Sequence, residues 1–175
     1  FTFNLELEVD AHSAAWVGLA VSDAEDSDAV IDSFKDGIAT TGAPPLAELL
    51  DNKPANHTPE VDAELEVAGT MRIRSTPQRP QNKAHVEGAF GLFSQNVPPI
   101  NLNINTSRRN IARSLLLLVA MSVARVINHR PRADRGGRSR AELYADEPTP
   151  EQIEQARAAL KDICHRQEQA RLTAE

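Results

Sequence analysis

The sequence predicts a single α/β domain followed by a helical C-terminal extension. Segments that alternate apolar and polar residues, as strands with one buried face do, are interleaved with segments whose apolar residues recur every three or four positions, as in helices. The chain has 175 residues, of which 41% are apolar, and this is long enough for one core of ordinary size. Thr149 to Gln152 form a capping box that opens a last helix, charged on most faces, which predicts the extension.

Two strands and a helix are predicted at the start of the chain. Residues 1–9 alternate strictly and residues 15–21 form a second apolar run, so the two are expected to pair as a hairpin. The acidic and Ser residues at 22–28 can cap a helix that Gly42 ends. Residues 46–50 predict a short strand, and this strand places Asp51 at its carboxyl end, where open α/β sheets have their ligand sites.

The second half of the chain is predicted to be mainly helical. The expected elements are a helix from Thr58 to Gly69, an edge strand over 71–74, a helix from about Asn82 to Phe93, a helix over 109–127 and the last helix to about Arg171. The apolar run within 115–124 is bracketed by Arg113 and Arg125. It is shorter than the roughly 20 residues that span a bilayer, so we predict a core helix and no membrane partner.

The charge of the chain is distributed unevenly. Residues 1–70 carry a net charge of −13, residues 71–141 carry +11 and residues 142–175 carry −4, although the whole chain carries only −6. The basic middle third predicts a phosphate-binding surface, and the alternative is a set of solvated arginines on ordinary helix faces. Residues 128–140 are too polar and Gly-rich to pack, so we predict an exposed basic loop there. The single cysteine, Cys164, excludes an internal disulfide and fits a cytoplasmic location.

Two carboxylates lie in recognisable sequence contexts. Asp51 ends the apolar run Leu-Leu-Asp-Asn, and Glu87, after 35 intervening residues, lies in the helical segment Asn-Lys-Ala-His-Val-Glu. Taken alone, each has a simpler interpretation, as part of a strand-ending turn or as a solvated helix residue. Because carboxylate oxygens are the ligands that Mg²⁺ prefers, the two together favour a metal site.

Four stretches resemble the catalytic core of the integrase and DDE transposase superfamily, which has the ribonuclease H-like fold. They occur in the family's order and are residues 9–18, 50–52, 79–87 and 128–144. The resemblance covers roughly residues 1–145 and implies a mixed sheet flanked by helices. It divides the chain into a partial integrase-like catalytic core (1–96), a core-closing helix and basic loop (97–145) and a C-terminal helix (146–175).

The resemblance implies that the full-length parent is a DDE-type polynucleotidyl transferase of a mobile element, which cleaves and transfers DNA strands with two metal ions. Asp51 and Glu87 would be the catalytic residues and the ligands of Mg²⁺ or Mn²⁺. The implied partners are DNA, as transposon ends and target, and further copies of the chain, with the last helix as the expected contact surface. The expected contacts to the DNA backbone come from Lys83, one helical turn before Glu87, and from Arg72, Arg74, Arg79, Arg130, Arg132, Arg135, Arg138 and Arg140.

The family uses three acids, and the first of them lies on a strand that precedes the other two. Between Asp10 and Asp51 the sequence predicts one strand before the helix, where the family has two. We therefore expect the first strand and the first carboxylate to lie upstream of Phe1, so that this chain is a fragment inactive alone; Asp10 as the first acid is the alternative. Two other functions stay open, a catalytically inactive DNA-binding or regulatory remnant and a ribonuclease H-like nuclease acting on RNA hybrids or junctions.

Overall fold

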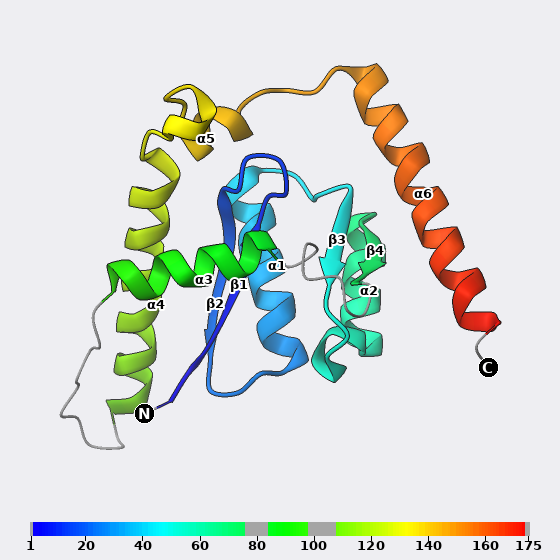
Figure 1. Cartoon of the computed structure of the whole chain (residues 1–175). Helices are drawn as coiled ribbons and strands as arrows, with labels where there is room; N and C mark the ends of the chain where they lie inside the picture. The colour runs from blue at the N-terminus through cyan, green and yellow to red at the C-terminus, as the bar shows by residue number, and fades with distance from the viewer. Residues whose placement is uncertain (1, 76–83, 98–107, 174–175) are drawn as a thin grey trace.

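The structure is a computed structural model that describes residues 2–75, 84–97 and 108–173. Its strands form two separate pairs (Figure 1). β1 (Asn4–Val9) and β2 (Trp16–Ser22) form an antiparallel hairpin, and β3 (Ala47–Leu50) and β4 (Met71–Arg74) pair in parallel. All four strands lie at the predicted positions.

Side chains cap the N-termini of α1, α2, α5 and α6. The Asp26 side chain caps α1 (Ser27–Thr41) and Gly42, with φ of 82°, ends it, while Thr58 caps α2 (Pro59–Ala68). The remaining helices are η1 (Pro54–His57), α3 (Ala84–Asn96), α4 (Arg109–His129), η4 (Ala133–Arg135), α5 (Arg140–Tyr144) and α6 (Pro150–Leu172).

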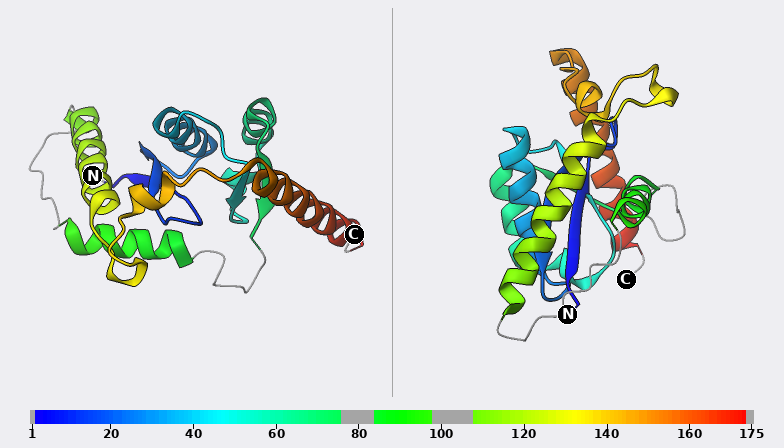
Figure 2. Two further views of the ribbon diagram at one scale, coloured as in Figure 1. Left: turned by 90° about the horizontal axis from the view of Figure 1, so that it is seen from above. Right: turned by 90° about the vertical axis from the view of Figure 1, so that its left-hand side faces the viewer.

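Two apolar clusters form the core. The first joins the hairpin to α3 and α4 and consists of Leu7, Trp16, Leu19, Ala89, Ala120, Ala124 and Ile127. The second joins α1 to β3 and α2 and consists of Val30, Phe34, Leu50, Val61 and Leu65. α1 lies on one face of the hairpin and α3 on the other, so the hairpin is the middle layer of three (Figure 2).

Carboxamide side chains close the outer edges of both strand pairs. The Asn128 Oδ1 accepts a hydrogen bond from the Trp16 N–H (2.9 Å), and its Nδ2 donates to the Trp16 carbonyl (2.8 Å), at the edge of β2. Gln167 of α6 repeats the arrangement at the edge of β4, where it accepts from the Arg74 N–H (3.0 Å) and donates to the Arg74 carbonyl (2.8 Å). Each side chain thus substitutes for a neighbouring strand.

Within the residues that the structure describes, no strand pairs with the inner edges, of β1 and β3, and none lies between them. Glu8 of β1 and Glu48 of β3 interact across this region. Burial and, to a lesser extent, the charge of Glu48 raise the pKa of Glu8 to about 9. Burial raises the pKa of Glu48 to about 7. The Asp10 carboxylate lies in the hairpin turn, where it accepts hydrogen bonds from the N–H and hydroxyl of Ser13.

Residues 128–140, predicted to be an exposed basic loop, are mostly exposed but also contain local structure. The segment contains η4, and its ends are joined where the Arg132 N–H donates to the Arg138 carbonyl (3.1 Å). Ser139 and Glu142 then form a capping box that starts α5, a helix that the sequence did not predict. The segment is held by its own hydrogen bonds because its polar side chains find partners within a few residues.

Candidate active site

Asp51 follows β3 directly, and local hydrogen bonds fix its carboxylate. Its Oδ1 accepts from the Lys53 N–H (3.1 Å) and from the Asn56 Nδ2 (2.5 Å). Such a turn, in which an Asp side chain bonds the backbone two residues on, commonly ends a strand. The side chain is therefore held at the carboxyl end of β3 before any ligand binds.

Further charged side chains surround Asp51. The Lys53 ammonium pairs with the Glu25 carboxylate, and this hydrogen bond, with the charges of Glu25, Asp51 and Glu6, raises the pKa of Lys53. Burial, assisted by the charges of Glu25 and Asp51, raises the pKa of Glu6 in β1. One ammonium thus lies among three carboxylates, so negative charge predominates at this end of β3.

Glu87 occupies the first turn of α3 and is exposed. α3 packs on β1, and the end that carries Glu87 is the end nearer to the β3–β4 pair (Figures 1 and 2). The connection from β4 to α3, residues 76–83, lies outside the described residues, and so do the predicted DNA contacts Arg79 and Lys83.

Carboxylate oxygens such as those of Asp51, Glu25 and Glu6 are the ligand atoms that a hard cation prefers. Among residues 2–75, 84–97 and 108–173, however, no group of three or more His, Cys, Asp or Glu side chains is placed so that it could hold a metal ion. The Asp51 carboxylate is held at the end of β3, and Lys53 supplies a positive charge beside it. The residues therefore fit part of a metal site.

Arg72 and Arg74, predicted to contact DNA, lie beside His57 on η1. The Arg72 side chain is only 12% exposed and forms an ion pair with Asp62 (2.6 Å). The Arg74 guanidinium lies 3.1 Å from the His57 Nδ1, and burial, followed by the charges of the two arginines, lowers the pKa of His57. A neutral imidazole therefore accepts from the guanidinium groups, and Arg72 is committed to contacts within the protein.

The arginines of the segment after α4 differ in how firmly their side chains are paired within the protein. Arg132 pairs with Asp134 (2.6 Å), and Arg138 makes two hydrogen bonds to the Asp146 carboxylate (2.8 and 2.7 Å). The side chains of Arg130 and Arg135 are exposed; the Arg130 guanidinium lies 3.4 Å from the Asn96 Oδ1, and the Arg135 Nε lies 3.9 Å from the Asp134 carboxylate. Of the predicted DNA contacts in this segment, Arg130 and Arg135 are therefore the most available, and Arg140 lies half-buried in a pocket described below.

Sequence reasoning did not find Glu6, Glu25 and Lys53 as neighbours of Asp51. Glu6 belonged to the polar face of a strand, and Glu25 to a run of helix-capping residues. The signal that pointed to them was the net charge of −13 over residues 1–70, but charge counts do not give spatial proximity.

Comparisons with known proteins place this arrangement in a structural class. No protein-family model matches the chain, and no curated protein matches it. The catalytic core domain of HTLV-2 integrase, solved in complex with magnesium as a trimeric form, aligns with a TM-score of 0.60 and 18% identity over 81% of this chain and 84% of that one. The core domain of BIV integrase aligns with a TM-score of 0.58 and 15% identity over 81% and 91%.

The chain has the ribonuclease H-like fold of an integrase catalytic core. A chain in the structure of a simian T-cell lymphotropic virus intasome, solved in complex with PP2A regulatory subunit B56 gamma, also aligns, with a TM-score of 0.57 and 18% identity, and the aligned part covers 85% of this chain but 55% of that one. In this integrase-like fold, the hairpin, α1, β3 and α3 follow one another in the order that the sequence motifs indicated.

Proposed function

We propose that the chain is a catalytic core of the integrase and transposase superfamily and that its full-length parent cleaves and joins DNA strands by metal-dependent phosphoryl transfer. The observation that carries the proposal is Asp51, held by its own turn at the carboxyl end of β3 within an integrase-like fold. Glu87, in the first turn of α3, is the second catalytic carboxylate. The likeness in fold supports the superfamily, and the two acids support the chemistry.

The protein's own residues would position the reacting groups. Asp51 and Glu87 would hold Mg²⁺ or Mn²⁺, which when bound activates the attacking water or 3′-hydroxyl and stabilises the leaving oxygen. Asn56 and the Lys53 N–H keep the Asp51 carboxylate in one orientation. The Lys53 ammonium, bound to Glu25, offsets negative charge at this end of β3. Exposed arginines such as Arg130 and Arg135 would hold the DNA backbone without reading its sequence.

The third carboxylate would come from a further strand between β1 and β3. The outer edges of both strand pairs are closed by Asn128 and Gln167, whereas the inner edges are unpaired and flank Glu8 and Glu48. A strand that pairs with both inner edges would complete the sheet and could place an acid near Asp51. Without it the site holds two of the three acids, so we propose that the chain is inactive alone.

Self-association is the second part of the proposal. α4 exposes a row of apolar side chains, among them Ile111 (62% exposed), Leu118 (61%) and Val126 (60%). Its opposite side, with Ala120 and Ala124, packs in the core against the hairpin. α4 is also the one helix in the described part of the chain that is long and apolar enough to cross a membrane. We propose that the exposed apolar row of α4 contacts a second copy of the chain. The sequence predicted α6 as this contact surface instead, and α6 has no buried residue.

The proposal is tested by nicking and strand-transfer assays on labelled DNA duplexes with the full-length protein. Activity should require Mg²⁺ or Mn²⁺ and should fall by at least about 100-fold in Asp51→Asn and Glu87→Gln, because each removes a metal ligand. Glu66→Gln, an exposed acid on α2, is the matched control and should keep wild-type activity.

The same assays separate the competing functions. Metal-independent DNA binding without cleavage would overturn the proposal and favour the DNA-binding or regulatory remnant. Cleavage confined to the RNA strand of a hybrid, or to a junction, would favour a ribonuclease H-like nuclease instead.

A further inference from the structure

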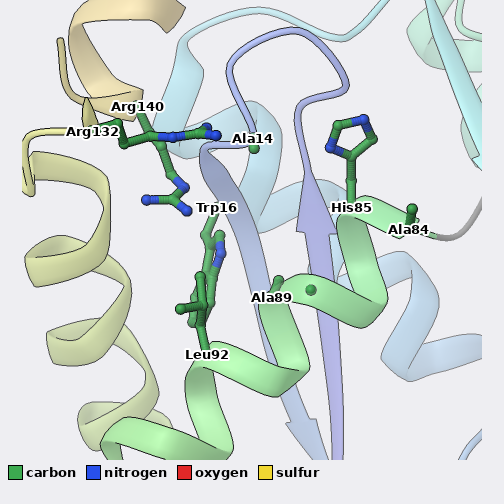
Figure 3. A pocket seen from close by; sticks show the side chains of 9 residues that line it. Ala14, Trp16, Ala84, His85, Ala89, Leu92, Arg132 and Arg140 are labelled. Atoms are coloured by element: carbon green, nitrogen blue, oxygen red, sulfur yellow. The ribbon is translucent and has the colours of Figure 1, made fainter. Parts of the chain in front are cut away.

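A pocket lies beside the hairpin turn, between the start of β2, α3 and the segment after α4. Its volume is about 140 Å³, several times the roughly 10 to 15 Å³ that a single water needs. Three parts of the chain line it: the start of β2 with the turn before it, α3 between Ala84 and Leu92, and the segment after α4. Figure 3 shows that the guanidinium groups of Arg132 and Arg140 enter it from one side, above the Trp16 indole.

The two arginines are not equally neutralised. Arg132 is paired with Asp134 (2.6 Å) and also donates to the Ser13 carbonyl (3.4 Å). Arg140 donates from one terminal nitrogen to the Ile127 carbonyl (3.3 Å), while its Nε is buried and makes no hydrogen bond within the described part of the chain. Burial, followed by the charge of Arg132, lowers the pKa of Arg140. The pocket therefore contains an excess of positive charge and an unused donor.

The remaining lining limits what can bind. Ala84, Gly88 and Ala89 present small side chains from α3, and His85 stands near the entrance on the first turn of that helix. Within residues 2–75, 84–97 and 108–173, no acidic side chain lines the pocket. The size of the pocket and the small side chains on its α3 side suit a compact ligand. Guanidinium donors bind oxyanions through charge-assisted hydrogen bonds.

We propose that this pocket binds a single phosphate group, held by Arg140 and Arg132 over the Trp16 indole. The phosphate is either free inorganic phosphate or one phosphate of a nucleic-acid strand. The lining includes neither Asp51 nor Glu87, and phosphate binding does not depend on strand transfer, so it can be tested whether or not the proposed function holds.

Trp16 makes occupancy measurable, because it is the only tryptophan in the chain and lines the pocket. Titration with inorganic phosphate, against sodium chloride at matched ionic strength, should change the Trp16 fluorescence saturably and raise the melting temperature over the same concentrations. Arg140→Gln should weaken the affinity by about tenfold or more, since hydrogen bonds to charged groups are the stronger ones. Arg157→Gln, the same change at an exposed position on α6, should bind like the wild type.

A second variant covers the case in which Arg140→Gln does not fold. A Cβ added at Gly88 would meet no atom within 4 Å, and Gly is a poor helix former, so Gly88→Leu should fold while its side chain fills the pocket. This variant should abolish the fluorescence response without changing any charge.

The two sources of phosphate are distinguished by a short single-stranded oligonucleotide without terminal phosphates. If it competes with inorganic phosphate at Trp16, the pocket takes a phosphate of the nucleic-acid backbone; if it does not compete, the pocket takes the free anion. A fluorescence response to phosphate that is absent, or that is the same in Arg140→Gln, Gly88→Leu and Arg157→Gln, would overturn the proposal.

Discussion

At the scale of single residues, Gly18 of β2 lies directly against the backbone of α1. A Cβ at this position would lie 2.3 Å from the backbone oxygen of Ser33, which a flexible side chain cannot relieve. We expect Gly18→Ala to lower the free energy of unfolding by about 1–3 kcal/mol or more, because α1 would have to move away from β2. Urea denaturation followed by circular dichroism measures this change.

Gly91 on α3 is the matched control for Gly18. A Cβ there meets nothing within 4 Å, and in a helix Ala is favoured over Gly by about 0.5–1 kcal/mol. Gly91→Ala should therefore leave the stability unchanged or raise it. Equal effects of the two substitutions would show that α1 does not lie as close to β2 as described.

Glu8 should make the stability depend on pH. Its folded pKa of about 9 lies above the ordinary value of 4.5, so the folded state binds the proton more tightly than the unfolded state. The stability contributed is complete below about pH 4.5 and is lost as the pH rises toward 9; Glu48, with a folded pKa of about 7, acts in the same direction. Glu8→Gln should therefore be more stable than the wild type at pH 8, by on the order of 1–3 kcal/mol.

Melting temperatures at pH 5, 7 and 8.5 check this expectation. The curve of Glu8→Gln should be flatter than that of the wild type, and the two should approach each other at pH 5. Glu66→Gln, which changes an exposed acid in the same way, should leave the shape of the wild-type curve unchanged. Parallel curves for Glu8→Gln and the wild type would refute the assignment.

At the scale of elements, local signals in the sequence were sufficient wherever a cap or an alternation was present. Asp26, Thr58 and Thr149 each accept the predicted type of N-cap hydrogen bond, and β4 has the predicted bounds. α5 and η4 were missed because the segment was interpreted from its polar, Gly-rich composition; the capping-box spacing of Ser139 and Glu142 is local in the sequence and could have predicted the start of α5. Side chains that close strand edges, such as Asn128, could not be predicted because their partners lie more than 90 residues away.

The closure of the β2 edge by Asn128 is testable. Asn128→Ala leaves the N–H and carbonyl of Trp16 without their side-chain partners, which we expect to cost about 1–3 kcal/mol of unfolding free energy. Asn110→Ala, an exposed position at the start of α4, should cost little. Chemical denaturation of both variants measures the difference, and a neutral Asn128→Ala would show that water replaces the side chain.

At the scale of the whole molecule, the exposed row on α4 should determine the oligomeric state. Leu118→Asp would place a carboxylate in the proposed contact, and burying an unpaired charge is strongly unfavourable, so self-association should weaken by at least about tenfold. Gln155→Asp adds the same charge at an exposed site on α6 and should not. Analytical ultracentrifugation decides between them. If Gln155→Asp dissociates the protein and Leu118→Asp does not, α6 is the contact surface.

The sequence predicted the fold class because it depends on motifs that are local in the chain, and the roles of Asp51 and Glu87 stay predictions. It could not predict the neighbourhood of Asp51, since Glu6, Glu25 and Lys53 come together only when β1, the start of α1 and β3 are packed. It also treated the arginines alike, although folding commits Arg72 and Arg138 to carboxylates and leaves Arg130 and Arg135 exposed. Spatial partners, and not residue types, decide which charges remain available.

The central claim, that Asp51 and Glu87 share the metal used for phosphoryl transfer, is tested most directly by iron-directed backbone cleavage. Fe²⁺ that replaces Mg²⁺ in the full-length protein generates hydroxyl radicals on addition of ascorbate and peroxide, and these cut the chain beside the metal. We expect cuts near residues 51 and 87 that excess Mg²⁺ suppresses and that both disappear in Asp51→Asn. Cuts near Glu6 and Glu25 that persist in Asp51→Asn, with none near residue 87, would contradict the account.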